Sequence, residues 1–287
     1  MTKLEEYIRD PKLFALHWKI IKYLSSIPKN EIRDGQAQVL HFLKRNAINV
    51  FPYNFIKKYN AKDLEIKRDK SNNLLYTLEQ GKRLYFKRNW KEKHIKRFYP
   101  VLQIEQDEDS PHRYLTEDFN VGKGDIVLDI GAAEGNFSLS IVEKVEKLFL
   151  FESDSQWLKA LEATFSPWKS KIEIINKFVS NEDKEKQFSL NTFFKSNKKV
   201  DFIKMDVEGA ELDVLKGSVD ILRETNSLKL AVCTYHRQND ANEIKDFLEK
   251  ENFITEFSKG YMIFYYDKLK APYLRKAVLR AKKDRMK

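Results

Sequence analysis

Residues 125–135, DIVLDIGAAEG, determine how this chain folds. The apolar run 125–130 is typical of a strand that is buried on both faces. Gly131 and Gly135 follow it, and glycines at these points allow a sharp turn into a helix and a close approach of a ligand to the backbone. The pattern predicts the first strand of an α/β sheet with a ligand at its carboxyl end.

The alternation of strand and helix continues to residue 266. Because strands that alternate with helices form largely parallel sheets, we predict a doubly wound α/β domain with helices on both faces. The last two strands follow each other directly and predict an antiparallel closing hairpin. The predicted strands are residues 125–130, 147–152, 171–176, 200–206, 228–235, 253–257 and 261–266, and the predicted helices are residues 136–145, 156–165, 210–223 and 241–251.

An acidic residue at the end of the second strand indicates a nucleoside ligand. Glu152 stands 21 residues after Gly131, and an acid at about this distance from a glycine turn binds the hydroxyls of a ribose. A dinucleotide is disfavoured, because Ala133 replaces the central glycine of its fingerprint and because Asp129 and Glu134 would repel a pyrophosphate. S-adenosylmethionine, which carries an ammonium and a sulfonium, fits these acids.

The segment DFIKMDVEGAE (201–211) concentrates charged residues at the end of a predicted strand. Lys204 and Asp206 face the same way by the period of a strand, so Asp206 emerges at the carboxyl end beside the ligand. Glu208 and Glu211 fall at the start of the next helix, where the helix dipole alone also explains acids. The following strand ends in TYHR (234–237), which places His236 at the same rim.

Together, DIVLDIGAAEG, Glu152 and DFIKMDVEGAE resemble the FkbM-family methyltransferases over about residues 105–266. The resemblance implies a Rossmann-like class I methyltransferase fold and S-adenosylmethionine as methyl donor, usually for hydroxyls of sugars or other secondary metabolites. It places the methionine end of the donor at residues 131–135, the ribose at Glu152 and the adenine near Asn176. The residues expected to contact the donor are Asp129, Gly131, Ala132, Ala133, Glu134, Gly135, Glu152, Ser153, Asn176 and Asp206.

Transfer of a methyl group to a hydroxyl requires that the hydroxyl lose its proton. His236 is the best general base by its ordinary pKa, with Asp206 as the orienting carboxylate or as the base itself. Glu208 is the third candidate catalytic residue. In an alternative arrangement, Asp206 and His236, together with Glu208, hold a divalent ion, for which Mg²⁺ is the first candidate, and this ion acidifies the hydroxyl.

A polar segment just before the first strand is expected to contact the substrate. Ser110, His112, Arg113 and Tyr114 fall in it, and such a segment forms part of the pocket roof in this fold. The alternative is an exposed acidic loop. Cys233 lies within an apolar strand and is expected to be an inert core residue.

The first hundred residues predict helices followed by a small β-meander. Apolar residues recur at helical spacing over 14–24 and 32–43, three β-like runs follow at 64–69, 74–80 and 82–88, and residues 91–101 return to helix. We divide the chain into an accessory region (1–104) on the substrate side, a methyltransferase domain (105–266) and a basic tail (267–287).

The net charge of +10 is concentrated in the tail. Residues 268–287 hold nine Lys or Arg and one Asp, so they contribute +8. Leu274, Ala277, Val278 and Ala281 recur there at helical spacing, which predicts an amphipathic helix. It would either touch an anionic membrane surface or another polyanion, or serve only solubility. Under both hypotheses its removal leaves the fold intact.

The single cysteine and the lack of long apolar runs indicate in which cellular compartment the protein is expected. One cysteine cannot form an intrachain disulfide, which favours a reducing environment. The start, MTKLEEYIRDPK, lacks the apolar core of a secretory signal, and no run approaches the roughly 18 apolar residues of a membrane span. We expect a cytoplasmic protein, peripheral at a membrane only through its tail.

The leading functional hypothesis is an O-methyltransferase that acts on a hydroxyl of a sugar, a glycan or a related metabolite, and this acceptor can be anionic. A nucleic-acid methyltransferase acting on ribose or base is the second hypothesis, which the basic tail supports and the nearly neutral body opposes. The third is a non-catalytic module that only binds the cofactor.

Overall fold

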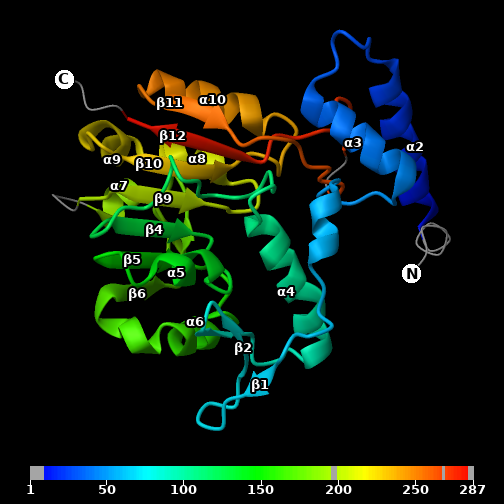
Figure 1. Cartoon of the computed structure of the whole chain (residues 1–287). Helices are drawn as coiled ribbons and strands as arrows, with labels where there is room; N and C mark the ends of the chain where they lie inside the picture. The colour runs from blue at the N-terminus through cyan, green and yellow to red at the C-terminus, as the bar shows by residue number, and fades with distance from the viewer. Residues whose placement is uncertain (1–9, 195–198, 267–268, 284–287) are drawn as a thin grey trace.

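The computed structural model describes residues 10–194, 199–266 and 269–283. Figure 1 shows a twisted sheet with its helices and, beside it, a smaller helical unit formed by the N-terminal residues. Helix α4 (Glu92–Gln106) lies between the two. No helix of the described part is long and apolar enough to cross a membrane.

The central sheet has seven strands within the described residues. They are β4 (Ile126–Ile130), β5 (Lys147–Phe151), β6 (Ile172–Ile175), β9 (Phe202–Met205), β10 (Lys229–Cys233), β11 (Ile254–Phe257) and β12 (Val278–Lys282), and they lie in the order β11-β12-β10-β9-β4-β5-β6. All run parallel except β12, which is antiparallel to both of its neighbours. Leaving out β12, the order is that of a Rossmann fold. The predicted fold class is therefore confirmed.

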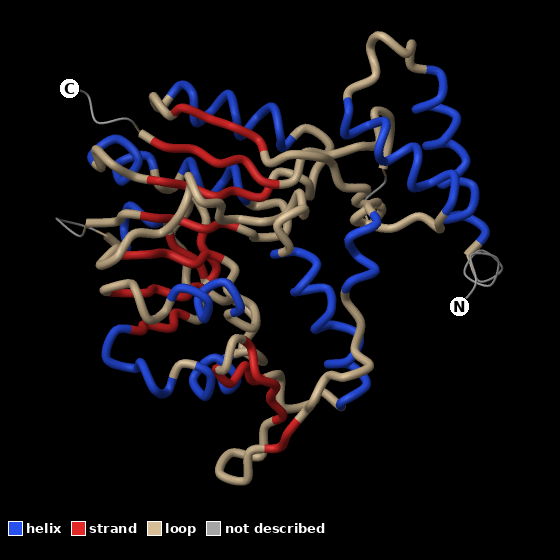
Figure 2. Tube along the Cα trace, in the orientation of Figure 1, coloured by secondary structure: helices blue, strands red, loops and turns tan. Residues whose placement is uncertain are grey.

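Both faces of the sheet are buried, as the apolar runs predict. Val127 and Leu148 belong to one core, which also contains side chains of α5 (Asn136–Ile141) and α6 (Leu158–Thr164). Leu128 and Phe149, the next residues along each strand, belong to the opposite core. That core is completed by α8 (Glu211–Lys216), α9 (Val219–Glu224) and α10 (Asp240–Lys250). Figure 2 shows these helices on the two sides of the strands.

The single helix predicted over 210–223 is two helices, α8 and α9, which are separated by Gly217 and Ser218. Gly217 packs against the backbone of Ser180, because a Cβ atom at residue 217 would lie 2.1 Å from the Ser180 carbonyl oxygen. The break therefore brings the chain close to the segment that leaves β7 (Phe178–Val179). Strand β7 pairs with β8 (Gln187–Phe188), and α7 (Leu190–Phe193) follows β8 in the chain.

The predicted closing hairpin and the predicted tail helix are both wrong. Residues 261–266 form no strand, and Met262 makes only an isolated bridge with Arg275. The partner of β11 is instead β12, from the segment that was expected to be an amphipathic helix. The apolar side chains of β12 are buried in the two cores, so the sheet continues past residue 266 to Lys282. Residues 267–268 and 284–287 of the expected tail lie outside the described residues.

The N-terminal elements agree with the sequence predictions. Helices α2 (Pro11–Ser26) and α3 (Asp34–Arg45) come first, followed by a short 3₁₀-helix at Asn54–Lys58. The meander is β1 (Lys67–Arg68), β2 (Leu75–Glu79) and β3 (Lys82–Tyr85). Tyr261, Ile263 and Leu274 pack with α2 and α3 in a third core, so the chain after β11 is held by the N-terminal helices.

Candidate active site

The turn after β4 requires glycine at two positions. Gly131 has φ +81°, and a Cβ atom there would lie 1.9 Å from the carbonyl oxygen of Asp206. Gly135 has φ +83°, and a Cβ atom there would lie 2.7 Å from the ring of Phe165. Left-handed backbone and close neighbours both exclude larger residues. The turn is thereby pressed against the end of β9, which carries Asp206.

A buried ion pair between two strands of the sheet holds this turn in place. The Lys204 ammonium donates to the carbonyl of Gly131 at 2.6 Å and lies 3.1 Å from Oδ1 of Asp129. The Ser138 hydroxyl donates to the other oxygen of Asp129 at 2.7 Å. Burial alone would lower the pKa of Lys204, but the carboxylates of Asp129 and Asp206 raise it. Asp129, expected to contact the cofactor, is therefore engaged in holding the turn.

Glu152 stands in the wall of a cavity of about 410 Å³. One carboxylate oxygen accepts the N–H of Ala133 and the other the N–H of Asp154, both at 2.7 Å. Burial raises the pKa of Glu152. The cavity is lined by Ile130, Gly131, Ala133, Phe151, Glu152, Ser153, Asp154, Trp157, Lys177, Phe178, Val179, Asp206, Val207 and Glu208.

Besides Asp129, four residues expected at the cofactor are not part of the cavity lining: Gly135 of the turn and the three described next. The Asn176 amide donates to the carbonyls of Glu152 and Ser153 at 2.6 and 3.1 Å, which fixes the loop after β5. Ala132 is buried and donates its N–H to Phe151. Glu134 is also buried, and burial raises its pKa to about 8.

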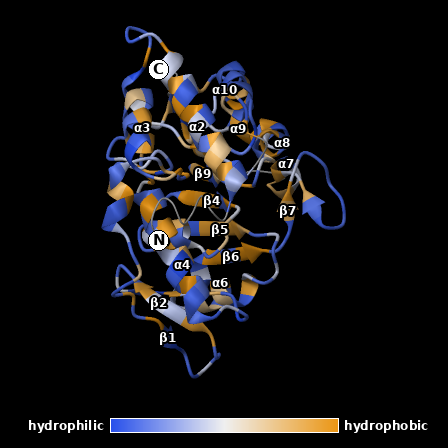
Figure 3. Ribbon diagram, turned by 90° about the vertical axis from the view of Figure 1, so that its right-hand side faces the viewer, coloured by the Kyte–Doolittle hydropathy of each residue, from blue (hydrophilic) through white to orange (hydrophobic). Residues whose placement is uncertain are grey.

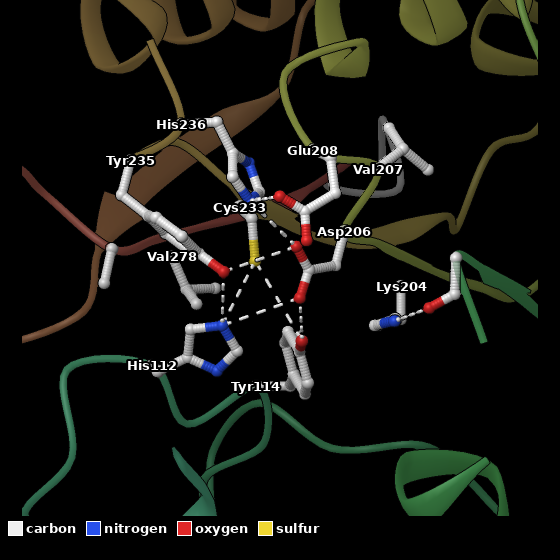
Figure 4. A network of polar contacts seen from close by, with 12 residues as sticks. His112, Tyr114, Lys204, Asp206, Val207, Glu208, Cys233, Tyr235, His236 and Val278 are labelled. Carbon is white, nitrogen blue, oxygen red and sulfur yellow. Dashed lines mark hydrogen bonds and ion pairs between the residues drawn. The ribbon is translucent and has the colours of Figure 1, made fainter. Parts of the chain in front are cut away.

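Asp206 is the centre of a network formed by four rings (Figure 4). The Tyr114 hydroxyl donates to Oδ2 at 2.8 Å, and the Tyr235 hydroxyl donates to Oδ1 at 3.4 Å. Nε2 of His112 lies 3.6 Å from Oδ2, and Nε2 of His236 lies 3.5 Å from Oδ1. Burial would raise the pKa of Asp206, but His112, Lys204 and His236 lower it. Asp206 is therefore a carboxylate.

His236 is held between carboxylates on both sides of its ring. Nδ1 lies 2.9 Å from Oε1 of Glu211, and Nε2 lies 3.5 Å from Oε2 of Glu208. Burial would lower the pKa of His236, but Glu211, Asp206 and Glu208 raise it. The carboxylate of Glu211 beside Nδ1 favours a proton on that nitrogen, and a neutral ring protonated on Nδ1 carries its lone pair on Nε2, the nitrogen nearest to Asp206.

The two remaining acids of this strand end differ strongly in exposure. Glu211 is fully buried at the start of α8, where Oε1 also accepts the N–H of Val207 at 3.0 Å. The Glu208 side chain is 87% exposed, and its backbone has φ +54°. The buried position of Glu211 against His236 shows a role beyond the favourable helix dipole.

The four residues expected to contact the substrate lie in two different places. His112 and Tyr114 face Asp206, as described above. Ser110 and Arg113 instead line a separate cavity of about 810 Å³, which is also bordered by β11 and the 3₁₀-helix. Arg280 of β12 connects the two sides, because its guanidinium donates to the carbonyls of Arg113 and Tyr114.

Sequence reasoning missed Tyr235 and the role of Glu211. Tyr235 directly precedes His236, and its hydroxyl lies 3.1 Å from Nε2 of His112. A signal was present, since Tyr235 is a polar aromatic at the end of an apolar strand. Cys233 lies 3.7 Å from His112, and burial raises the pKa of its thiol well above the ordinary value, which agrees with the expected inert thiol.

Comparisons with known proteins relate this site to a family. The family model described as "Methyltransferase FkbM domain" matches residues 76–255, more than half of the chain. A search of curated proteins finds no match.

Three solved structures are similar to this chain at low identity. The methyltransferase FkbM of Methylobacillus flagellatus is 18% identical with a TM-score of 0.47, over 66% of this chain and 60% of that one. TYW2 of M. jannaschii, solved with AdoMet, is 14% identical with a TM-score of 0.44, over 77% and 90%. SMU.1697c of Streptococcus mutans, a putative methyltransferase solved with SAH, is 14% identical with a TM-score of 0.40, over 56% and 90%. The chain thus spans three fifths of the first of these proteins.

Proposed function

This chain belongs to the FkbM methyltransferase family, and on that premise we propose that it transfers a methyl group from S-adenosylmethionine to a hydroxyl of a sugar, a glycan or a related metabolite. One observation carries the proposal. Asp206 both lines the cavity that contains Glu152 and accepts hydrogen bonds in the cluster that contains His236. A methyl donor in the cavity and a proton acceptor are therefore adjacent.

The cavity fits the nucleoside part of S-adenosylmethionine. A carboxylate oxygen has two lone pairs, and each oxygen of Glu152 gives one of them to a backbone N–H. One lone pair on each oxygen stays available for the two hydroxyls of a ribose. The volume of about 410 Å³ lies in the range of small-molecule sites.

The acid beside the glycine turn fits a cationic ligand. Lys204 already neutralises Asp129, so within the described residues Glu134 is the acid of the glycine turn that forms no ion pair. Its pKa of about 8 reflects burial, and a nearby cation would lower that pKa and favour the carboxylate. When bound, S-adenosylmethionine supplies a methyl group on a positively charged sulfur.

We assign proton removal to His236. Nε2 carries the lone pair of the neutral ring and faces Asp206 at 3.5 Å. The acceptor oxygen forms its new bond to the methyl carbon as the carbon–sulfur bond breaks, and its proton passes to Nε2. The resulting imidazolium is stabilised by the carboxylates of Glu211 and Asp206, and positioning supplies much of the rate.

Asp206 orients the acceptor in this scheme. Its lowered pKa makes it a weak base but a good acceptor of a hydrogen bond. Tyr114 fixes the carboxylate through a bond of 2.8 Å. Glu208, exposed at the entrance of the cavity, is suited to contact the part of the acceptor that stays in solvent.

A divalent ion is an alternative role for the same residues. Asp206, Glu211 and His236 offer ligand atoms within 4.8 Å of one another. This donor set does not favour Mg²⁺, which prefers oxygen ligands in octahedral geometry, because one donor is nitrogen and Oε1 of Glu211 already accepts a backbone N–H. A chelator assay separates the two roles: activity that EDTA abolishes and Mg²⁺ restores would assign Asp206 and His236 to an ion.

Nucleic-acid methylation is the competing proposal for the acceptor. The basic tail supported it, but two of the tail's arginines are bonded inside the fold. Arg275 donates to the carbonyls of Tyr235 and His236, and Arg280 donates to those of Arg113 and Tyr114. The basic surface on which that proposal depends is correspondingly reduced.

The first test is methyl transfer from labelled S-adenosylmethionine to nucleotide sugars and glycans, with RNA as the competing acceptor. Mass spectrometry should show a gain of one CH₂ on a sugar or glycan. Methylation of RNA alone would contradict the proposed acceptor, and a donor that binds without turnover on any acceptor would indicate a non-catalytic module.

Two variants separate donor binding from chemistry. Glu152→Ala should weaken donor binding by roughly 10- to 150-fold, equivalent to about 1.5–3 kcal/mol, because hydrogen bonds to a charged group are lost. His236→Ala should lower kcat by about 10²- to 10⁴-fold while calorimetry shows unchanged donor affinity. Glu162→Ala, on the surface of α6, is the matched control for Glu152→Ala. Near-normal turnover of His236→Ala would leave Asp206 as the base.

A further inference from the structure

Helix α2 has one face buried and one face exposed. Ile20, Ile21 and Leu24 are buried in the third core. On the other face, Phe14 is 43% exposed and Trp18 is 53% exposed. Their rings meet edge to face with centroids 6.3 Å apart. Two adjacent large aromatic side chains on the surface point to an interaction surface.

The exposed face of α2 is also basic. Lys12, Lys19 and Lys22 are exposed on it, and the helix sequence PKLFALHWKIIKYLSS contains no acidic residue. The nearby Asp10 caps the helix, because its carboxylate accepts the N–H groups of Lys12 and Leu13 at 3.0 Å. The lysines of α2 therefore carry three positive charges with no acid on the same helix.

A hollow beside α2 adds a fourth lysine. A cavity of about 410 Å³ lies between α2 and residues 269–273. Lys12, Lys19 and Lys270 line it together with the apolar side chains of Leu16 and Leu269. Ammonium groups around an apolar floor match a phosphate group attached to a hydrocarbon chain.

We propose that the α2 face, defined as Lys12, Phe14, Trp18, Lys19, Lys22 and Lys270, docks on the surface of an anionic phospholipid bilayer. Lysines are attracted to the anionic headgroups, and Trp and Phe side chains enter the interfacial region. The apolar floor formed by Leu16 and Leu269 favours a bilayer over a nucleic acid, because it matches hydrocarbon, whereas exposed aromatic rings alone also suit stacking on bases. The inference does not depend on the identity of the methyl acceptor.

The position of α2 suits such docking. Figure 1 shows α2 at the outer edge of the molecule, on the side toward which the carboxyl ends of β4 and β9 point. Figure 3 views this side directly and shows α2 in front, with hydrophilic and hydrophobic residues along it. A bilayer on the α2 face would therefore lie on the same side as the cluster around Asp206.

The test is cosedimentation of the full chain with vesicles of phosphatidylcholine, with and without phosphatidylglycerol. Binding should require phosphatidylglycerol and should fall as salt rises. The triple variant Lys12→Gln, Lys19→Gln, Lys22→Gln should bind about 100-fold more weakly, at about fivefold per lysine. The control Lys93→Gln, Lys96→Gln, Lys250→Gln changes the charge equally at exposed positions elsewhere and should bind as the parent does.

A second variant tests insertion rather than charge. Trp18→Ser should weaken vesicle binding and remove a blue shift of tryptophan emission that the parent shows with phosphatidylglycerol vesicles. The proposal is overturned if the parent does not bind these vesicles, if both triple variants lose binding equally, or if the protein binds only a soluble polyanion such as heparin.

Discussion

β9 and β12 lie on either side of β10, and both carry a basic residue into the interior of the sheet. On β9, Lys204 is buried against Asp129 and donates to the carbonyl of Gly131. On β12, Arg280 is half-buried and donates only to carbonyls, those of Arg113 and Tyr114. The first cation has a buried ion-pair partner, whereas the second makes its hydrogen bonds to the backbone and faces the acid Glu256 across the strand pair.

The two cations nevertheless have the same effect on the site. Lys204 fixes the glycine turn beside the cavity, and Arg280 fixes the segment that carries His112 and Tyr114. Arg275, just before β12, adds a third case by donating to the carbonyls of Tyr235 and His236. Charge-assisted bonds are stronger than neutral ones, so the three loops that surround Asp206 are each held by a cation from the sheet or its margin.

Removing β12 is expected to have the largest effect, in contrast to the prediction from the sequence that loss of the tail leaves the fold intact. Deletion of residues 275–287 removes a strand whose five residues pair with β10 and four of whose residues pair with β11. The truncated chain should be insoluble or should show no cooperative thermal unfolding by circular dichroism. Lys282→Gln, which removes one exposed charge and keeps the strand, is the control and should melt as the parent does. A truncated chain that folds normally would refute the role of β12 in the sheet.

Two single substitutions compare Lys204 and Arg280 directly. Lys204→Met leaves the buried Asp129 without its cationic partner and should cost about 3–5 kcal/mol. Arg280→Met leaves two carbonyls without their donor and Glu256 exposed to solvent on the edge strand, and should cost about 1.5–3 kcal/mol. Urea unfolding of both variants provides the free energies of unfolding. Equal losses would show that the charged partner of Lys204 makes no difference.

A pair of glycines tests the contact between the turn and β9. Gly131→Ala combines a left-handed backbone with a Cβ atom 1.9 Å from the carbonyl of Asp206, so we expect a loss of at least about 2–3 kcal/mol. Gly124 has φ +79° with open space around it, and Gly124→Ala should cost only about 1–2 kcal/mol. The difference in unfolding free energy measures the clash alone, and no difference would indicate that the turn can move away from Asp206.

The sequence predicts β9 well and β12 poorly for a physical reason. Apolar runs at 125–130 and 200–206, each followed by acids or glycines, are local patterns, and they predicted both the strands and the edge where Asp206 lies. Val278 and Ala281 satisfy helical spacing with Leu274 and Ala277, but their burial in a strand depends on pairing with β10 and β11. The charge of Arg280 suggested exposure, whereas its hydrogen bonds are made to carbonyls 166 and 167 residues away in sequence.

The residues of the candidate site, like the strands, were predicted where the pattern is local and missed where contacts depend on distant parts of the chain. Asp206, Glu208 and His236 follow from strand ends, because the carboxyl ends of neighbouring parallel strands meet. The contact of Glu211 with Nδ1 of His236 depends on where α8 begins, and the division of Ser110 and Arg113 from His112 and Tyr114 depends on the path of a loop. Neither of these can be derived from spacing.

The smallest expected effect is a shift in the pH profile of kcat. It tests whether Glu211, in the helix that follows β9, sets the pKa of His236. Glu211, at the start of the helix that follows β9, raises the pKa of His236, as do Asp206 and Glu208. Glu211→Gln keeps an oxygen for the N–H of Val207 and removes the charge, so the pKa of His236 should fall.

The neutral imidazole is the active base, so activity rises with pH as His236 loses its proton. With a lower pKa this rise occurs at lower pH, and the ascending limb of kcat against pH should move toward acid in Glu211→Gln. Glu208→Gln also removes a carboxylate near Nε2, but its side chain is 87% exposed, and water screens its charge, so its limb should move less. If neither limb moves while both variants bind the donor normally, the titrating group is not His236, and proton transfer must be assigned to Asp206.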